Sequence, residues 1–283
     1  MAKSSRLTFL RFILKRSRRL QIGLCIFGFL VVYSIIGLFL PANAGGPNFA
    51  GYQPPSLEHF FGTDAIGHDI FIQTLIGSWY SMEIGVIAGS IATLLGVVVG
   101  GFGAYFGRIV DEVASGLTNV VITIPTLALL LVIASFSAVR SQWTIIFLIA
   151  IVSWPATARA IRAQVLSLKS REFVDVAKQS GLSRTRVLVA EVLPNMLGFI
   201  VMSFATMVGG AVIAESSLSA LGLGPSSVTS LGIILYWAIT FQAAGTGIWW
   251  WLLPPGILIT LYPLSLLLIK DGLGNIFNPR TRK

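Results

Sequence analysis

Residues 171–183 (REFVDVAKQSGLS) are a charged stretch between long apolar segments, and the rest of the chain is organised around them. The pattern predicts a short helix that begins after Ser170, because serine is a common helix N-cap. A small-to-apolar stripe follows the helical spacing i, i+3, i+4, i+7 and consists of Phe173, Val176, Ala177 and Ser180. Gly181 then predicts the C-terminal end of this helix, because glycine tolerates the left-handed conformation found there.

A second short helix is predicted from Ser183, another capping residue, to Pro194 in the closing motif EVLP (191–194). Both helices are amphipathic, the pair is basic, and a glycine separates them. Two such helices between apolar segments are typical of a docking surface. A soluble partner protein is therefore expected to bind here.

The composition indicates a membrane protein. The 283 residues are 55% hydrophobic with a mean hydropathy of +0.84. Only 11% of the residues are charged, against about 25% in soluble domains. Such a chain has more apolar surface than one soluble core could hide, so the bilayer is its expected solvent. The net charge of +9 does not indicate nucleic-acid binding, because the basic residues lie at the ends of apolar segments and form no patch with aromatic residues.

Six apolar blocks predict an all-α membrane protein with six transmembrane helices. The first block, residues 21–40, holds no charged residue, and at about 1.5 Å per residue it can cross a hydrocarbon layer of about 30 Å. A cleavable signal peptide is the alternative, since Ala42, Asn43 and Ala44 resemble a cleavage site, but the long apolar run favours a retained span. The other five blocks lie near residues 80–106, 115–138, 142–160, 196–221 and 248–270.

The basic residues predict an orientation with both termini in the cytoplasm. In that orientation only Arg140 of the 20 lysines and arginines lies outside. The loop at 161–194, between helices 4 and 5, carries the docking helices and is then cytoplasmic. The expected order is a basic cytoplasmic arm, a first span, an extracytoplasmic segment, a five-helix core and a cytoplasmic tail, at residues 1–20, 21–41, 42–79, 80–270 and 271–283.

Small residues and prolines mark the second, third and fourth apolar blocks. Pro125 and Pro155 can kink the third and fourth helices, because proline lacks a backbone donor. The glycines allow two interpretations, a face on which helix backbones pack closely or a face that lines a path, and close packing is favoured. These glycines of the second block are Gly85, Gly89, Gly96, Gly100, Gly103 and Gly107.

Glu83 and Glu215 are the acids in or near the predicted spans, and a carboxylate in a membrane is a functional candidate by default. Glu215 begins the segment ESSLSALGLG (215–224). Glu215, Ser216 and Ser219 are therefore candidates to line a substrate path. The alternative is a carboxylate that nearby serines and backbone donors satisfy.

Residues 61–71 (FGTDAIGHDIF) are expected to form a turn, because two glycines and two aspartates can satisfy local backbone donors. A divalent-metal site is the alternative, since carboxylates and imidazoles are ligands for such ions. Its candidate ligands would be His59, Asp64, His68 and Asp69. The turn is favoured, and we assign no metal site.

The charged stretch resembles the EAA loop of bacterial and archaeal ABC importer permeases. The resemblance rests on Asp175, Ala177 and Gly181, then nine residues, and then the motif at 191–194. The sequence departs from the usual loop at Asp175, where the family has glutamate, at Val176, where it has the first alanine, and at the first residue of the closing motif, where glutamate is unusual.

Three further segments resemble one subfamily, the second permease subunit of dipeptide, oligopeptide and nickel importers. The segment 215–224 is similar to its signature, residues 61–71 to its extracytoplasmic motif, and residues 271–280 to its C-terminal ending. His68 stands where the subfamily has arginine, and Asn278 stands where it has aspartate. With the EAA loop, four motifs follow one another in the expected order.

The resemblance implies a permease subunit of an ATP-driven importer in a prokaryotic plasma membrane. It implies as partners a homologous second permease, two ATPase subunits and an extracytoplasmic substrate-binding protein. It implies no cofactor on this chain, with ATP and magnesium held by the ATPase subunits. Peptides are the expected substrate, and oligosaccharides or nickel are the alternatives. The residues expected to couple to the ATPase are Glu172, Phe173, Asp175, Ala177, Gly181, Leu182 and Arg184.

The motifs that the sequence lacks also bear on function. No G-x-x-x-x-G-K-[ST], G-x-S-x-G or H-E-x-x-H motif occurs. The chain is therefore not expected to be an enzyme, and its energy must come from a partner. An autonomous channel or ion-coupled transporter is a further alternative, disfavoured because the predicted spans hold few charges for a relay.

Overall fold

The computed structural model describes residues 17–41, 44–137 and 140–277, the last three of these without their side chains. Within these ranges the regular structure is helical, and the one β-bridge joins Thr63 and Asp69. Most of the basic N-terminal arm, residues 42–43 of the cleavage-like motif and the C-terminal residues 278–283 lie outside the described residues.

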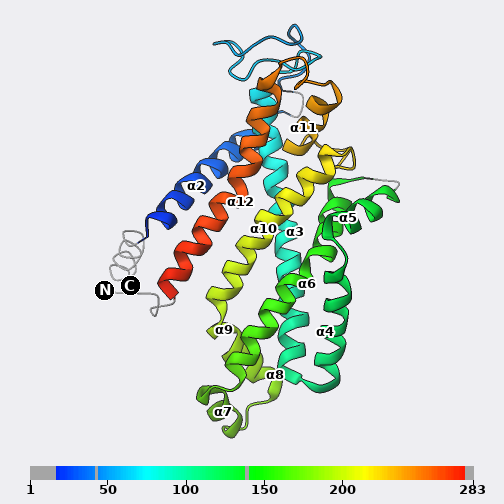
Figure 1. Cartoon of the computed structure of the whole chain (residues 1–283). Coiled ribbons are helices and arrows are strands. Elements are labelled where there is room, and N and C mark those ends of the chain that lie inside the picture. The colour runs from blue at the N-terminus through cyan, green and yellow to red at the C-terminus, as the bar shows by residue number, and fades with distance from the viewer. Residues whose placement is uncertain (1–16, 42–43, 138–139, 278–283) are drawn as a thin grey trace.

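Five long helices form an elongated bundle (Figure 1). Each of them is long and apolar enough to cross a membrane, and a sixth crossing is possible where two shorter helices follow one another. The all-helical prediction is confirmed for the described residues, whereas the count of six spans is narrowed only to five or six. The long helices are α2 (Arg18–Leu38), α3 (Ile70–Phe106), α6 (Gln142–Lys169), α10 (Leu197–Ala220) and α12 (Trp249–Phe277).

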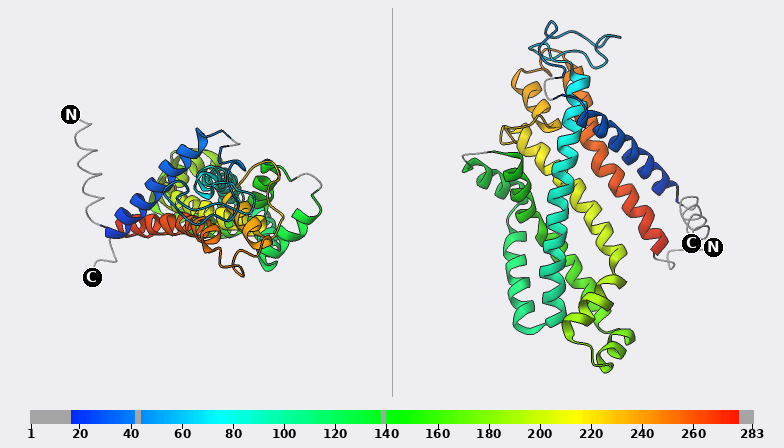
Figure 2. Two further views of the ribbon diagram at one scale, coloured as in Figure 1. Left: turned by 90° about the horizontal axis from the view of Figure 1, so that it is seen from above. Right: turned by 180° about the vertical axis from the view of Figure 1, so that it is seen from behind.

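Helix α3 is the centre of the bundle. It packs most extensively against α6, α10 and α2. Figure 2 shows α3 in cyan along the length of the molecule, with α2 and α12 on one side and the green helices on the other. The segment 44–69 and the short helix α11 (Leu231–Thr240) lie together at one end. The three short helices that directly follow α6 lie at the other end (Figure 1), namely α7 (Glu172–Gln179), α8 (Arg184–Val187) and α9 (Leu193–Asn195).

Glycines allow α3 to touch its neighbours at backbone distance. A Cβ at Gly89 would lie 2.8 Å from the backbone nitrogen of Val208 in α10. A Cβ at Gly100 would collide with the carbonyl group of Ala158 in α6. The packing interpretation of the glycine stripe is therefore confirmed, as expected for helices whose association in lipid depends on close contact.

The prediction that the third span is a single helix over residues 115–138 is wrong. This span consists of α4 (Arg108–Thr123) and α5 (Thr126–Ser135), whose axes differ by 83°. Ile124 is extended before Pro125, because a proline ring disfavours the helical conformation of the preceding residue. Pro155, in contrast, lies inside the continuous helix α6.

Helix α3 begins at Ile70, ten residues before the apolar block that predicted it. Asp69 is its N-cap, and its Oδ1 accepts hydrogen bonds from the backbone N–H groups of Phe71 and Ile72 at 2.8 and 3.2 Å. The polar cap residue starts the helix inside the segment that the sequence assigned to the extracytoplasmic side.

A hydroxyl cluster joins α2, α3 and α12 in the half of the bundle nearer α11. The Tyr262 hydroxyl lies 2.7 Å from the hydroxyls of both Ser34 and Ser78, and these two lie 3.0 Å apart. At the opposite end of α2, Arg19 and Asp271 form an ion pair at 3.8 Å. A polar contact near each end of α2 thus joins this helix to α12.

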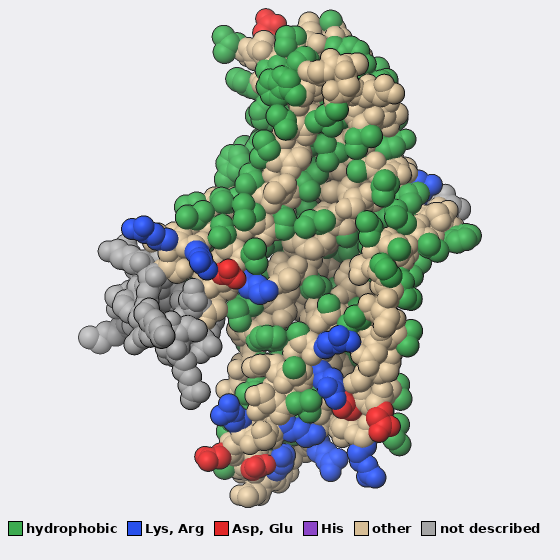
Figure 3. All heavy atoms as spheres, viewed as in Figure 1, with side chains coloured by type: hydrophobic (Ala, Val, Ile, Leu, Met, Phe, Trp, Pro, Cys, Tyr) green, Lys and Arg blue, Asp and Glu red, His purple; other side chains and the backbone are tan. Residues whose placement is uncertain are grey.

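Basic side chains gather on the lower half of the face shown in Figure 3, around the short helices that directly follow α6 and around the start of α2. Hydrophobic side chains are spread over the upper half of the same face, where few charged side chains are seen. This asymmetry matches the charge distribution from which the orientation was inferred. The orientation itself stays a prediction.

Candidate functional site

The charged stretch forms two short helices that project from the end of the bundle (Figure 1). We call residues 171–194 the docking loop. It contains α7 (Glu172–Gln179) and α8 (Arg184–Val187), and then a π-helical turn, η1 (Leu188–Val192), that runs into α9 (Leu193–Asn195). The predicted second helix from Ser183 to Pro194 is therefore present as three consecutive segments. The Ser183 hydroxyl accepts a hydrogen bond from the backbone N–H of Arg186 at 3.4 Å, which confirms the predicted cap.

The predicted cap at the start of α7 is wrong. Helix α6 continues to Lys169, so Ser170 serves as its C-cap, and the Ser170 hydroxyl donates to the carbonyl oxygen of Ser167 at 3.4 Å. Arg171 occupies the N-cap position of α7 and makes no side-chain capping bond there. Ser170 therefore belongs to the C-terminal end of α6 and does not cap α7.

The predicted end of α7 at Gly181 is confirmed. Gly181 has a φ of +80°, and its N–H donates to the carbonyl oxygen of Lys178 at 3.0 Å. The next residue, Leu182, donates from its N–H to the carbonyl oxygen of Ala177 at 3.4 Å. These two bonds make a Schellman motif, which requires the left-handed conformation that glycine adopts without strain.

The buried face of α7 differs from the predicted stripe. Val174 is fully buried and Ala177 is 8% exposed, in a cluster with Val187, Leu188 and Val192. Phe173 is half-buried, Ser180 is exposed and Val176 is 61% exposed. The reason is tertiary: α8 and η1 fold back against the side of α7 that carries Val174, a contact that helical spacing alone does not specify.

The exposed face of the docking loop is charged. Four of the predicted coupling residues are exposed, namely Glu172, Asp175, Gly181 and Arg184. Phe173 and Leu182 are half-buried, and buried Ala177 supports the loop from within. The Nζ of Lys178 lies 2.9 Å from Oδ1 of Asp175 across this face. Val176, an exposed apolar residue beside Asp175, is a candidate contact that the sequence analysis did not include. Its position within a charged run was the signal that could have identified it.

A second candidate lies inside the bundle, where serine hydroxyls enclose Glu215. Its Oε1 accepts from the hydroxyls of Ser230 and Ser219 at 2.6 and 2.7 Å. Its Oε2 accepts from those of Ser81 and Ser216 at 3.2 and 3.3 Å. We call these five residues the serine cage. Its carboxylate is 0% exposed, so the four hydroxyls replace water as its donors.

The serine cage also fixes the start of α11. The Ser81 hydroxyl accepts from the backbone N–H of Leu231 at 3.1 Å, and the Ser230 hydroxyl accepts from that of Ile233 at 3.3 Å. The same two hydroxyls donate to Glu215, so α3, α10 and α11 meet at one carboxylate. Sequence reasoning missed Ser81 and Ser230, which lie 134 and 15 residues from Glu215 along the chain.

The geometry agrees with the alternative in which serines satisfy Glu215. The side chains of Ser216 and Ser219 are also buried, at 5% and 0% exposure. A role for Glu215, Ser216 and Ser219 in a substrate path stays a prediction. Glu83, the other acid singled out, is half-buried on α3.

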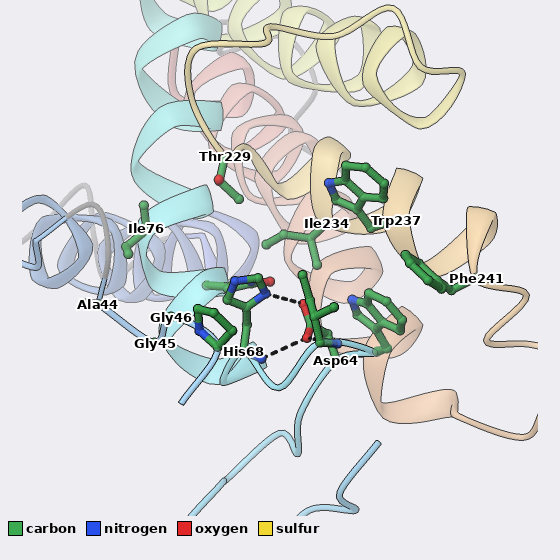
Figure 4. Close-up of a pocket in the computed structure, with 14 residues that line it drawn as sticks. Ala44, Gly45, Gly46, Asp64, His68, Ile76, Thr229, Ile234, Trp237 and Phe241 are labelled. Carbon is green, nitrogen blue, oxygen red and sulfur yellow. Dashed lines mark hydrogen bonds and ion pairs between the residues drawn. The ribbon is translucent and has the colours of Figure 1, made fainter. Parts of the chain in front are cut away.

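A cavity of about 520 Å³ opens at the end of the bundle that carries α11 (Figure 4). His68 and Asp64 face Ile234 and Trp237 of α11 across it. Oδ1 of Asp64 accepts from the backbone N–H groups of Ile66 and His68 at 3.0 and 2.8 Å, so the predicted turn is confirmed.

The four candidate metal ligands of this segment form two separate pairs. Nδ1 of His68 lies 2.7 Å from Oδ2 of Asp64, and Nδ1 of His59 lies 3.0 Å from Oδ2 of Asp69. No group of three or more such ligands occurs among the residues that the structure describes. The arrangement provides a turn and a helix cap.

Comparison with known sequences gives a family match. Residues 92–283 match the family described as "Binding-protein-dependent transport system inner membrane component". The dipeptide transport system permease protein DppC of Bacillus subtilis (strain 168) is 32% identical over 273 residues, which cover 95% of this chain and 84% of that protein. A candidate peptide permease of Brucella suis biovar 1 (strain 1330) is 35% identical over 227 residues, covering 80% and 74%.

Comparison with solved structures gives a match in fold. A chain of the MetNI methionine ABC transporter, in an inward-facing conformation, superposes with a TM-score of 0.56. The match covers 74% of this chain and 97% of that one, at 18% sequence identity. At this identity the likeness concerns the arrangement of the helices alone.

Proposed function

This chain belongs to the family of binding-protein-dependent transport inner-membrane components, and from that premise we propose that it forms half of the translocation path for peptides in an ATP-driven importer. The peptide substrate is proposed because two similar proteins are named as a dipeptide permease and a candidate peptide permease. Oligosaccharides and nickel are the alternative substrates. The path would be shared with a homologous second permease.

The docking loop is the observation that carries the proposal. It projects from the end of the bundle with Glu172, Asp175 and Arg184 exposed on its charged face. Val174 and Ala177 pack its inner face against the turn that leads into α9. A rigid projection that is continuous with the bundle can pass the motion of a bound ATPase to the helices. One ATPase subunit would contact this loop, and a second would contact the other permease.

The remaining partners follow from the same assembly. A substrate-binding protein outside the membrane would deliver the peptide at the end of the bundle that carries α11. Hydrolysis of ATP, with its magnesium ion, would take place on the two ATPase subunits. The chain would lie in a prokaryotic plasma membrane with the docking loop and both termini in the cytoplasm, in agreement with the positive-inside bias.

The function is tested by purifying the tagged protein with its partners and reconstituting the complex into liposomes with ATP inside. We expect the two ATPases, the second permease and the binding protein to co-purify. We also expect uptake of a peptide carried by the binding protein, and loss of uptake when ATP is omitted. Flux through the isolated, well-folded chain would instead indicate an autonomous channel. ATP-dependent uptake of an oligosaccharide or of nickel, without peptide uptake, would overturn the substrate.

The orientation has its own test, because the sequence contains a single cysteine, Cys25. In a Cys25→Ser background, Ser183→Cys places a thiol in the docking loop, and Ser56→Cys places one in the segment before α3. Both serines are exposed. A membrane-impermeant thiol reagent added to intact cells should label Ser56→Cys and spare Ser183→Cys. The opposite result would reverse the orientation.

A further inference from the structure

Helix α4 presents its polar side to the bundle and its apolar side outward. Ile109, Val113 and Val120 are 74%, 66% and 63% exposed. On the inner side, Thr118 is buried, and Asp111 and Asn119 bond to arginines of α6. A polar cavity of about 270 Å³ lies between α4 and α6, and its polar lining consists of Ser115, Thr118, Asn119, Arg159 and Arg162.

The two arginines of this cavity differ in their partners. Nε and Nη2 of Arg162 donate to the two carboxylate oxygens of Asp111, each at 2.7 Å. This bidentate pair neutralises Arg162. Nη2 of Arg159 donates to Oδ1 of Asn119 at 2.8 Å, and Asn119 carries no charge. No carboxylate of the described residues forms an ion pair with Arg159, so its positive charge has no protein counterion there.

Arg159 also lines a second cavity of about 460 Å³. This cavity lies where the break after α4 meets α6 and α10, and its lining includes Thr126, Ser153, Ala156, Met207 and Gly210. Small and apolar side chains therefore face it, and a Cβ at Gly210 would meet no atom within 4 Å. Arg159 stands at the junction of this groove with the polar cavity, about three turns before the end of α6.

We infer that Arg159 binds the C-terminal carboxylate of a peptide in transit, while the groove beside it accepts the adjacent residues. The inference rests on the proposed function. A free peptide carries an ionised carboxylate at neutral pH, because the pKa of that group is about 3.5. A guanidinium has five N–H donors and binds a carboxylate in a planar, bidentate fashion. Asn119 occupies one nitrogen of Arg159, which leaves donors for a ligand.

The test compares one peptide with its C-terminal amide in the reconstituted complex. Each is supplied at a concentration that saturates the binding protein, so that capture does not differ. With Arg159→Gln we expect uptake of the free acid to fall about tenfold, as for the loss of one charge-assisted contact, and uptake of the amide to stay unchanged. Arg159→Lys keeps the charge but not the bidentate geometry, so its acid uptake should lie between those of the wild type and Arg159→Gln.

Two control variants separate charge from structure. Asn119→Ala removes the hydrogen-bond partner that Arg159 has among the residues that the structure describes, and it should leave the acid-to-amide ratio unchanged. If Arg159 only held α4 against α6, Asn119→Ala would reproduce the defect of Arg159→Gln, and the inference would be overturned. Arg18→Gln removes one exposed positive charge on α2, away from both cavities, and should have no effect.

Other outcomes also decide the matter. Equal losses for the acid and the amide, or losses that disappear in liposomes without anionic lipid, would assign Arg159 to packing or to a lipid phosphate and overturn the inference. An unchanged ratio in Arg159→Gln would overturn it while leaving the proposed function intact. Absence of uptake of either peptide by the wild-type complex would contradict the proposed function itself.

Discussion

The docking loop and the serine cage both contain carboxylates and serines, but they use the carboxylates in opposite ways. In the docking loop, Glu172 and Asp175 face outward, and apolar side chains hold the helix in place. In the serine cage, Glu215 faces inward and itself holds three helices together. The comparison teaches that residue type does not distinguish a contact surface from an anchor. The exposure of the carboxylate, and the distance along the chain to its partners, do.

The largest expected effect is at Glu215 in the serine cage. Glu215→Gln keeps the shape of the side chain but replaces one acceptor oxygen with a donor nitrogen, so at least one hydroxyl of the cage loses its acceptor. Because such a buried donor stays unsatisfied, we expect the free energy of unfolding to fall by about 2–3 kcal/mol. Tryptophan fluorescence of the purified protein in detergent, followed during denaturation, measures this.

The matched control for Glu215→Gln is Glu112→Gln, at an exposed position of α4. It should leave the free energy of unfolding within about 0.5 kcal/mol of the wild-type value. Equal stability of the two variants would show that the serine cage does not hold the helices together, and the contrast with the docking loop would fail.

The next effect distinguishes the two faces of α7. Val174→Ala removes two buried carbon atoms, and we expect local opening of α7 to become easier by about 2 kcal/mol. Val176→Ala changes an exposed side chain and should leave opening within about 0.5 kcal/mol, while lowering the ATPase activity that the loaded binding protein stimulates. Hydrogen exchange of the α7 amides and an ATPase assay measure the two effects. The reverse pattern would place the partner contact on the inner face.

Gly181 tests whether the turn itself matters. Gly181→Val forces a β-branched residue to φ +80°, at a cost of about 1–2 kcal/mol. Gly181→Asn meets the same open space, since no atom lies within 4 Å of a Cβ there, and asparagine tolerates this conformation. We expect faster hydrogen exchange at the end of α7 and weaker ATPase coupling for valine only. Equal coupling in both variants would exclude a role for the turn geometry.

The smallest effect belongs to the exposed ion pair. Lys178→Ala removes the partner of Asp175, whose side chain is 59% exposed. Exposed pairs at this helical spacing contribute about 0.2–0.5 kcal/mol, and salt weakens them. Hydrogen exchange of α7 should therefore change by a factor of about two at low salt and less at high salt. A loss as large as that of Val174→Ala would mean that charge, and not packing, holds the docking loop.

Local sequence signals correctly predicted where α7 ends and where α8 begins. The end of α7 at Gly181 and the cap at Ser183 depend on residues within a few positions, and both are present. The prediction of the start of α7 was wrong because helix α6 extends beyond the apolar block from which it was predicted. The prediction of the buried stripe was wrong because the packing of α8 and η1 determines which side of α7 is covered. Helical periodicity alone does not specify that packing.

Interactions between distant segments were the part that sequence reasoning could not reach. Glu215 was recognised as unusual, but two of its four donors come from α3 and from the residue before α11. Pro125 was recognised as a kink, but a single proline in the sequence does not specify the 83° angle between α4 and α5. Arg159 was counted only as a marker of orientation, because the two cavities that it lines are formed by helices far apart in sequence.

The length of α3 can be compared with the thickness of a membrane. A helix of 37 residues is about 55 Å long, whereas a bilayer with its headgroups is about 40–45 Å thick. Even at a tilt of about 20°, α3 is longer than the membrane is thick. At least one end of α3 therefore extends beyond the headgroups. In the expected orientation, its first turns and the cavity beside His68 are at the end that faces the extracytoplasmic side.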